Sequence, residues 1–73
     1  MKTLKQLITE EYGSINNFIN EKLKEYNGEL PLKREHIYKL LNHEIPNPGI
    51  KSLNQLAEIV KVDREFVYKE FSE

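Results

Sequence analysis

Apolar residues recur along most of the chain at spacings of three and four, which is the pattern of one buried face of an α-helix. The first such segment spans residues 2–12, and its apolar face consists of Leu4, Leu7, Ile8 and Tyr12. Gly13 follows, and glycine is the residue that most readily adopts the left-handed conformation at a helix C-terminus. The pattern therefore predicts a first helix that ends at Gly13.

Two further helices are predicted in the middle of the chain. The second begins at Ser14, a favourable N-cap residue, and is closed by Asn27-Gly28. Its apolar positions are Ile15, Phe18, Ile19, Leu23 and Tyr26. Residues 29–32 form an ordered connector, and a third helix runs from Lys33 to about Asn42. Its inward-facing residues are Ile37, Leu40 and Leu41.

The C-terminal part of the chain predicts two more helices. Residues 45–49 cannot be helical, because two prolines and a glycine interrupt them. Ser52 and Gln55 have the spacing of a capping box and open a fourth helix. The apolar residues of that helix are Leu53, Leu56, Ala57 and Val60. After a short turn, Asp63 caps a fifth helix that carries Phe66, Val67 and Phe71 on one side. The expected fold is all-α, with five short helices in a single domain spanning residues 1–73.

Composition supports one small, compact domain. With 73 residues and 38% hydrophobic side chains, the chain can form one core and has no room for a second. Eleven basic residues nearly balance twelve acidic ones, which argues against intrinsic disorder. The chain has no cysteine, no apolar run of membrane-spanning length and no segment resembling a signal peptide. We expect a soluble cytoplasmic protein that does not contact a membrane.

The residues needed for catalysis or metal binding are not grouped in the sequence. The two histidines, His36 and His43, would be roughly 10 Å apart along one continuous helix, too far to share a metal ion. The three glycines are isolated, so no phosphate-binding loop is present. We therefore expect no enzymatic activity, no cofactor and no metal site.

Charge is distributed unevenly along the chain. Residues 33–51 carry two more basic than acidic side chains, whereas residues 63–73 carry two more acidic than basic ones. The basic stretch also contains side chains that can hydrogen-bond to phosphates and base edges, namely Tyr38, Asn42, His43 and Asn47. A charge run of this kind is equally typical of a solvated helix face, so the assignment depends on the surrounding pattern.

That pattern resembles a known family. Leu32, Ile37 and Leu40 have the spacing of a hydrophobic residue that ends a turn and two that face inward from the next helix. A loop with Asn and Pro follows, and then a helix pattern formed by Leu53, Leu56-Ala57, Val60, Val62 and Asp63. Residues 32–63 thus resemble the Cro/lambda-repressor-like helix-turn-helix regulators, also called the xenobiotic-response-element type.

The chain departs from that family at several positions. Phe18 is followed by Ile19 where the family has a small residue, Leu41 replaces a glutamate, and His43 replaces a glycine. The stretch from Phe18 to Leu32 is also longer than the tight turn of the family. The expected domain is therefore lambda-repressor-like with a lengthened second helix or turn.

The resemblance implies a bacterial or bacteriophage transcriptional regulator that binds a double-stranded DNA operator through its third helix. The candidates for base or nearby backbone contact are Lys33, Arg34, His36 and Tyr38. The candidates for phosphate contact are Lys39, Asn42, His43, Asn47 and Lys51, together with Asn16 and Asn17 at the start of the second helix. Arg34 is the best candidate for a guanine contact. Glu35 either accepts a hydrogen bond from a cytosine amino group or, more simply, is a favourable acid in the first turn.

Two expectations concern partners. The resemblance suggests a weak homodimer on a two-fold operator, with Tyr68 and Phe71 of the last helix at the contact. The alternative is a protein-interaction module on the same fold, similar to an antirepressor or an antitoxin. It is supported by the sequence pI of about 6.1 and by the acidic, aromatic last helix. A DNA-binding protein of this kind would be associated with the nucleoid.

Overall fold

The computed structural model describes residues 2–72, and this part of the chain contains five helices and no strand. The helices are α1 (Leu4–Tyr12), α2 (Ile15–Glu25), α3 (Arg34–Leu41), α4 (Ile50–Val60) and α5 (Arg64–Phe71). The predicted all-α fold with five helices is confirmed. The predicted third helix agrees with α3 to within one residue at each end, since Lys33 and Asn42 are its caps.

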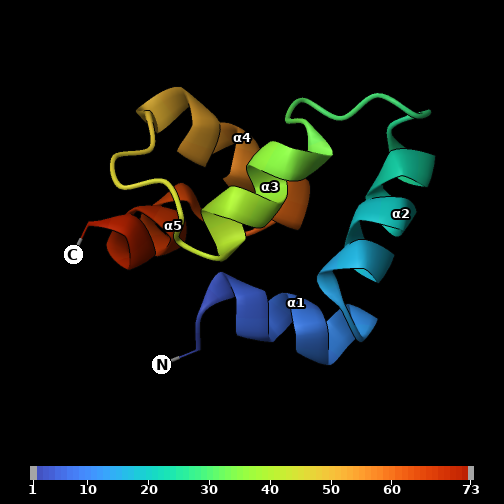
Figure 1. The fold of residues 1–73 in the computed structure, drawn as a ribbon, viewed down its shortest axis with the longest axis horizontal. Helices are drawn as coiled ribbons and strands as arrows, with labels where there is room; N and C mark the ends of the chain where they lie inside the picture. The colour runs from blue at the N-terminus through green and yellow to red at the C-terminus, as the bar shows by residue number, and fades with distance from the viewer. Residues whose placement is uncertain (1, 73) are drawn as a thin grey trace.

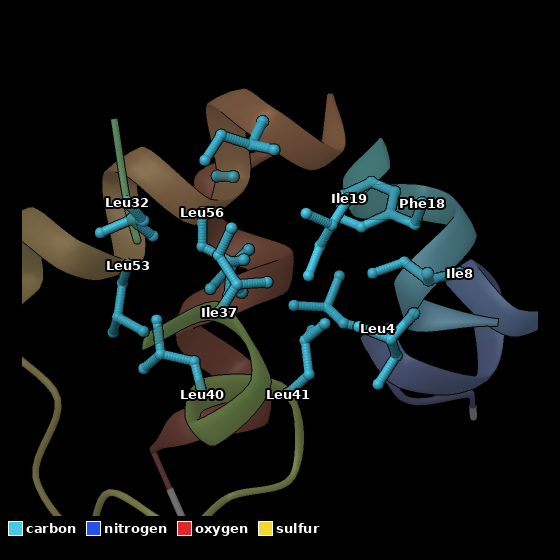
Figure 2. Close-up of a cluster of buried hydrophobic side chains, with 14 residues drawn as sticks. Leu4, Ile8, Phe18, Ile19, Leu32, Ile37, Leu40, Leu41, Leu53 and Leu56 are labelled. Atoms are coloured by element: carbon cyan, nitrogen blue, oxygen red, sulfur yellow. The ribbon is translucent and has the colours of Figure 1, made fainter. Parts of the chain in front are cut away.

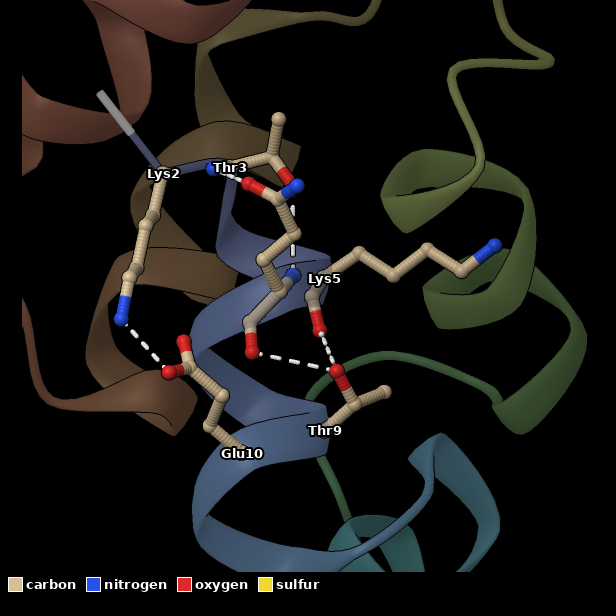
Figure 3. A network of polar contacts seen from close by, with 6 residues as sticks. Lys2, Thr3, Lys5, Thr9 and Glu10 are labelled. Carbon is tan, nitrogen blue, oxygen red and sulfur yellow. Dashed lines mark hydrogen bonds and ion pairs between the residues drawn. The ribbon is translucent and has the colours of Figure 1, made fainter.

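A reciprocal capping box begins α1 (Figure 3). The Thr3 hydroxyl accepts a hydrogen bond from the Gln6 backbone N–H at 3.2 Å, and the Gln6 side chain accepts one from the Thr3 N–H at 2.8 Å. Two backbone donors that have no partner within the helix are thereby satisfied. An exposed ion pair also joins Lys2, which precedes α1, to Glu10 within the helix. The Lys2 ammonium lies 2.5 Å from a Glu10 carboxylate oxygen.

The predicted signals at the end of α1 and at both ends of α2 are confirmed. Gly13 closes α1 at φ 88°, a left-handed conformation. Ser14 is the N-cap of α2 and accepts a hydrogen bond from the Asn17 N–H at 3.1 Å. At the other end, Asn27 and Gly28 both have positive φ, and the Gly28 N–H reaches back to the Leu23 carbonyl at 2.7 Å. Residues 26–33 then connect α2 to α3.

The predicted capping box at Ser52 and Gln55 is wrong. The N-cap of α4 is Gly49, whose backbone is extended at φ −69° and ψ 151°, and the first helical residue is Ile50. The residues after Pro48 are free to adopt helical conformation, so the helix begins before Ser52. Ser52 therefore lies inside the first turn and cannot be the N-cap. The prediction for α5 is half right: Asp63 is its N-cap, although its side chain makes no capping hydrogen bond.

All five helices contribute buried side chains to one core, with α3 in the middle (Figure 2). The inward face of α3 is the predicted one, Ile37, Leu40 and Leu41. The other buried hydrophobic residues are Leu4 and Ile8 of α1, Ile15, Phe18 and Ile19 of α2, Leu53, Leu56, Ala57 and Ile59 of α4, Val67 of α5, and Leu32 of the connector. The sequence pattern omits Ile59, which is fully buried, and includes Val60, which is only half-buried.

The arrangement leaves α3 on one broad face of the molecule. In Figure 1, α3 lies in front of α4, with α2 on one side, α5 on the other and α1 below. The molecule measures 32 × 24 × 21 Å along its principal axes. Within residues 2–72, no helix combines the length and the apolar character needed to cross a bilayer.

Candidate nucleic-acid interface

The face of α3 opposite its buried residues is a polar stripe. It consists of Glu35, Lys39 and Asn42, all exposed. These residues are separated by four and three positions, so they lie one above the other along the helix. We call them the α3 stripe. Because the other face of α3 is fixed in the core, the helix presents this stripe on a rigid support.

Two hydrogen bonds join α2 to α3 beside the stripe. The Arg34 guanidinium donates to the Asn20 side-chain oxygen at 3.0 Å, and the Tyr38 hydroxyl donates to the Asn16 side-chain oxygen at 3.5 Å. The partners are one helical turn apart on each helix, and the earlier residue of α2 meets the later residue of α3. The two helices therefore run in opposite directions along this edge, as Figure 1 shows.

These bonds bring together three of the predicted contact residues, namely Asn16, Arg34 and Tyr38. Sequence reasoning missed the fourth member, Asn20. A signal for it does exist, since Asn16 and Asn20 have the same four-residue spacing as Arg34 and Tyr38. Asn17, predicted beside Asn16, instead binds the junction between α1 and α2, where its side-chain amide donates to the Tyr12 carbonyl at 3.1 Å.

The remaining predicted contact residues lie at the start of α3, within it, or in the segment that follows it. Lys33 is exposed at its N-cap, and His36 is half-buried in its first turns. Asn47 lies in the loop after α3, and Lys51 lies in the first turn of α4. Both are exposed, as is the neighbouring Ile50, with 66% of its surface accessible. Among the described residues, no side-chain hydrogen bond or ion pair joins Asn47 or Lys51 to α3.

His43 is held by α5. It follows α3 with a left-handed backbone at φ 56°, and its Nε2 atom lies 2.6 Å from a Glu70 carboxylate oxygen. Its ring also stacks on Phe71, with centroids 4.5 Å apart and planes at 14°. The Glu70 side chain is nearly buried, and its second carboxylate oxygen accepts a hydrogen bond from the Leu4 backbone N–H at 2.7 Å. Sequence reasoning missed Glu70, which ties the start of α1 and the end of α3 to α5.

The position of His43 also shows how the two histidines lie relative to each other. Because α3 ends at Leu41, His36 and His43 do not share a continuous helix. Over residues 2–72, no group of three or more His, Cys, Asp or Glu side chains could hold a metal ion.

The two residues predicted at a dimer contact already have intramolecular partners. The Tyr68 hydroxyl donates to the Asn54 side-chain oxygen of α4, and one face of the Phe71 ring is covered by His43. Both side chains are half-buried. They support the packing of α5, and their role in a dimer stays a prediction.

A buried lysine of α2 belongs to a charged cluster that reaches the end of α4 through Glu25. The Lys22 side chain is almost fully buried beside the rings of Tyr12 and Phe18, and its ammonium lies 2.9 Å from Glu25. Burial alone would lower the pKa of Lys22, but its hydrogen bond to Glu25 and the field of Tyr12 outweigh burial and raise it. Glu25 also pairs with Lys61 at 3.3 Å, and the hydrogen bonds from the two lysines lower its pKa.

Comparison with known proteins adds no relative from which a role could be transferred. No protein-family model matches the chain, and neither the curated proteins nor the solved structures include a match to it.

Proposed function

We propose that this protein is a sequence-specific DNA-binding transcriptional regulator of the Cro/lambda-repressor-like helix-turn-helix type, which inserts α3 into the major groove. The observation that supports the proposal is the division of α3 into two faces. One face anchors the helix in the core, and the other presents the α3 stripe. The basic residues Lys33 and Arg34 lie at the N-terminal end of the helix. Such a regulator acts in the cytoplasm, on the nucleoid.

The roles of individual residues follow from their positions. Lys33, Arg34, His36 and Tyr38 are proposed to contact bases or the adjacent backbone. Phosphate contacts are proposed for Asn16, Lys39, Asn42, Asn47 and Lys51. Arg34 remains available to DNA while it is bound to Asn20, because a guanidinium has five N–H donors and Asn20 accepts from one nitrogen.

Binding measurements with three variants test the proposal. Arg34→Ala should weaken binding to a selected site by roughly 1–3 kcal/mol and relax base preference at one position. Lys39→Ala should weaken binding about equally on all sequences and reduce the dependence of affinity on salt. Lys69→Ala is the matched control, because it removes an exposed lysine from α5 and should change affinity least. The wild-type protein must bind random duplex DNA at low salt, and failure to do so would contradict the proposal.

A protein-interaction module on the same fold is the second candidate. It is supported by the half-buried aromatic side chains of α5, Phe66, Tyr68 and Phe71. In that case the protein would bind no DNA at any ionic strength, and its partner would bind at α5. The measurements above therefore separate the two candidates.

A further inference from the structure

Glu35 is the acidic residue of the exposed face of α3. It lies in the first turn, on the α3 stripe, one turn before Lys39 and two turns before Asn42. Its side chain is exposed, and no hydrogen bond or ion pair with another side chain of residues 2–72 engages it. An unpaired carboxylate therefore stands on the surface that, in the proposed function, faces DNA.

The structure separates Glu35 from its neighbour Arg34. The Arg34 guanidinium is held at the α2 edge by Asn20, whereas Glu35 lies on the side of α3 opposite Ile37, Leu40 and Leu41. When α3 enters the groove with its core-facing side turned away, Glu35 faces the base edges, and Arg34 faces them from the side of α2.

A carboxylate in the major groove is unfavourable at most base pairs. Guanine presents two acceptors there, thymine presents an acceptor and a methyl group, and the phosphates on both sides are negative. Adenine has an amino donor, but its N7 acceptor lies beside it and repels the second carboxylate oxygen. The cytosine amino group has no acceptor next to it on the same base, so it is the donor that a carboxylate prefers.

We propose that Glu35 determines base specificity, an inference that rests on the proposed function. Glu35 accepts a hydrogen bond from a cytosine N4 amino group and disfavours sites that lack cytosine at that position. The first-turn location also makes Glu35 favourable to the helix dipole. A role confined to the dipole would not give a base preference, so base preference is the readout that distinguishes the two roles.

Selection from a pool of randomised duplexes tests the inference with the wild-type chain, Glu35→Gln and Glu44→Gln. The wild type should select cytosine at one position of the site. Glu35→Gln should lose affinity for the cytosine site by about tenfold and select adenine there, because an amide can donate to N7 and accept from N6. Glu44 is an exposed acid just beyond α3. Glu44→Gln should strengthen binding to all sequences while the cytosine preference stays.

The outcomes separate this inference from the proposed function. If the wild type and Glu35→Gln select the same site, or if Glu44→Gln shifts the preference in the same way, Glu35 does not determine specificity and DNA binding stands. If the wild type enriches no duplex even at low salt, both proposals are overturned. Far-UV circular dichroism of each variant checks that its helices are intact.

Discussion

His43 has a backbone conformation that favours glycine. At φ 56°, a residue with a Cβ atom is strained by roughly 1–2 kcal/mol. Two side-chain contacts offset this strain, namely the pair with Glu70 and the stacking on Phe71. The Cro/lambda-repressor-like family proposed for this chain has glycine at the corresponding position. A histidine is tolerated here because its side-chain contacts with α5 compensate for the backbone strain that glycine would avoid.

Two substitutions of His43 separate the side-chain contacts from the backbone strain. His43→Ala removes both contacts and keeps the strain, whereas His43→Gly removes the contacts and relieves the strain. We expect His43→Ala to be the least stable form, below His43→Gly by about 1 kcal/mol. Urea unfolding followed by circular dichroism gives the free energies. Equal stability of the two variants would show that the left-handed backbone carries no such cost.

Glu25 should make stability depend on pH. Its pKa is lower in the folded protein than in the unfolded chain, so the stabilisation is present above the ordinary glutamate pKa of about 4.3 and is lost as the pH falls through the folded value. Glu25→Gln should therefore be less stable than the wild type at neutral pH, and the difference should shrink in acid.

Thermal unfolding midpoints measured from neutral to acid pH check this expectation. Glu58→Gln is the control, since Glu58 is an exposed acid of α4 outside the ion pairs of the described residues. A constant difference between Glu25→Gln and the wild type at all pH values would mean that the Lys22–Glu25–Lys61 cluster does not stabilise the fold through its charges.

At the scale of elements, the same short pattern has two different structural outcomes. Thr3 with Gln6 and Ser52 with Gln55 have identical spacing, yet only the first pair caps a helix. The difference arises outside the pattern, because Pro48-Gly49 permits helix to begin before Ser52 is reached. A capping box predicts a helix start only when the preceding residues are kept out of the helix.

Alanine substitutions at these two hydroxyl residues should have unequal effects. Thr3→Ala removes a capping acceptor and should cost about 1 kcal/mol of stability. Ser52→Ala should be neutral or slightly stabilising, because alanine is the better helix former inside a first turn. Chemical denaturation of both variants gives the comparison. A similar loss for Ser52→Ala would mean that the serine hydroxyl does cap α4 in solution.

Helical periodicity predicted the elements well and their mutual contacts poorly. The inward face of α3 followed from the spacing of Ile37, Leu40 and Leu41, because burial of one stripe is a local property of a helix. The bonds from Arg34 to Asn20 and from His43 to Glu70 join residues 14 and 27 positions apart. Such pairs depend on the angle and position at which two helices cross. The spacing of residues along a single helix does not predict that crossing.

At the scale of the whole molecule, one copy of α3 would cover only a few base pairs of the DNA that it is proposed to bind. We expect two copies to bind an operator on a two-fold axis, with half-sites about one helical turn, or ~34 Å, apart. Because Tyr68 and Phe71 are half-buried and have partners within their own chain, they offer little surface to a second copy. Association in free solution should therefore be weak.

Sedimentation of the free protein and of its complex with a selected duplex tests this expectation. The free protein should be mainly monomeric, and two copies should bind each duplex. A complex of one protein on a site without internal symmetry would contradict the dimer and favour a monomeric regulator.

The hydrogen bond between the Leu4 N–H and Glu70 places the beginning of α1 beside the end of α5. A short linker could therefore join these two ends, and new ends could be opened at the exposed Asn27-Gly28 turn. In such a circular permutant α3 would come first along the chain and α2 last, with the Asn20–Arg34 and Asn16–Tyr38 bonds left as links between side chains. The pairing of α2 with α3 would then no longer depend on the peptide that connects them.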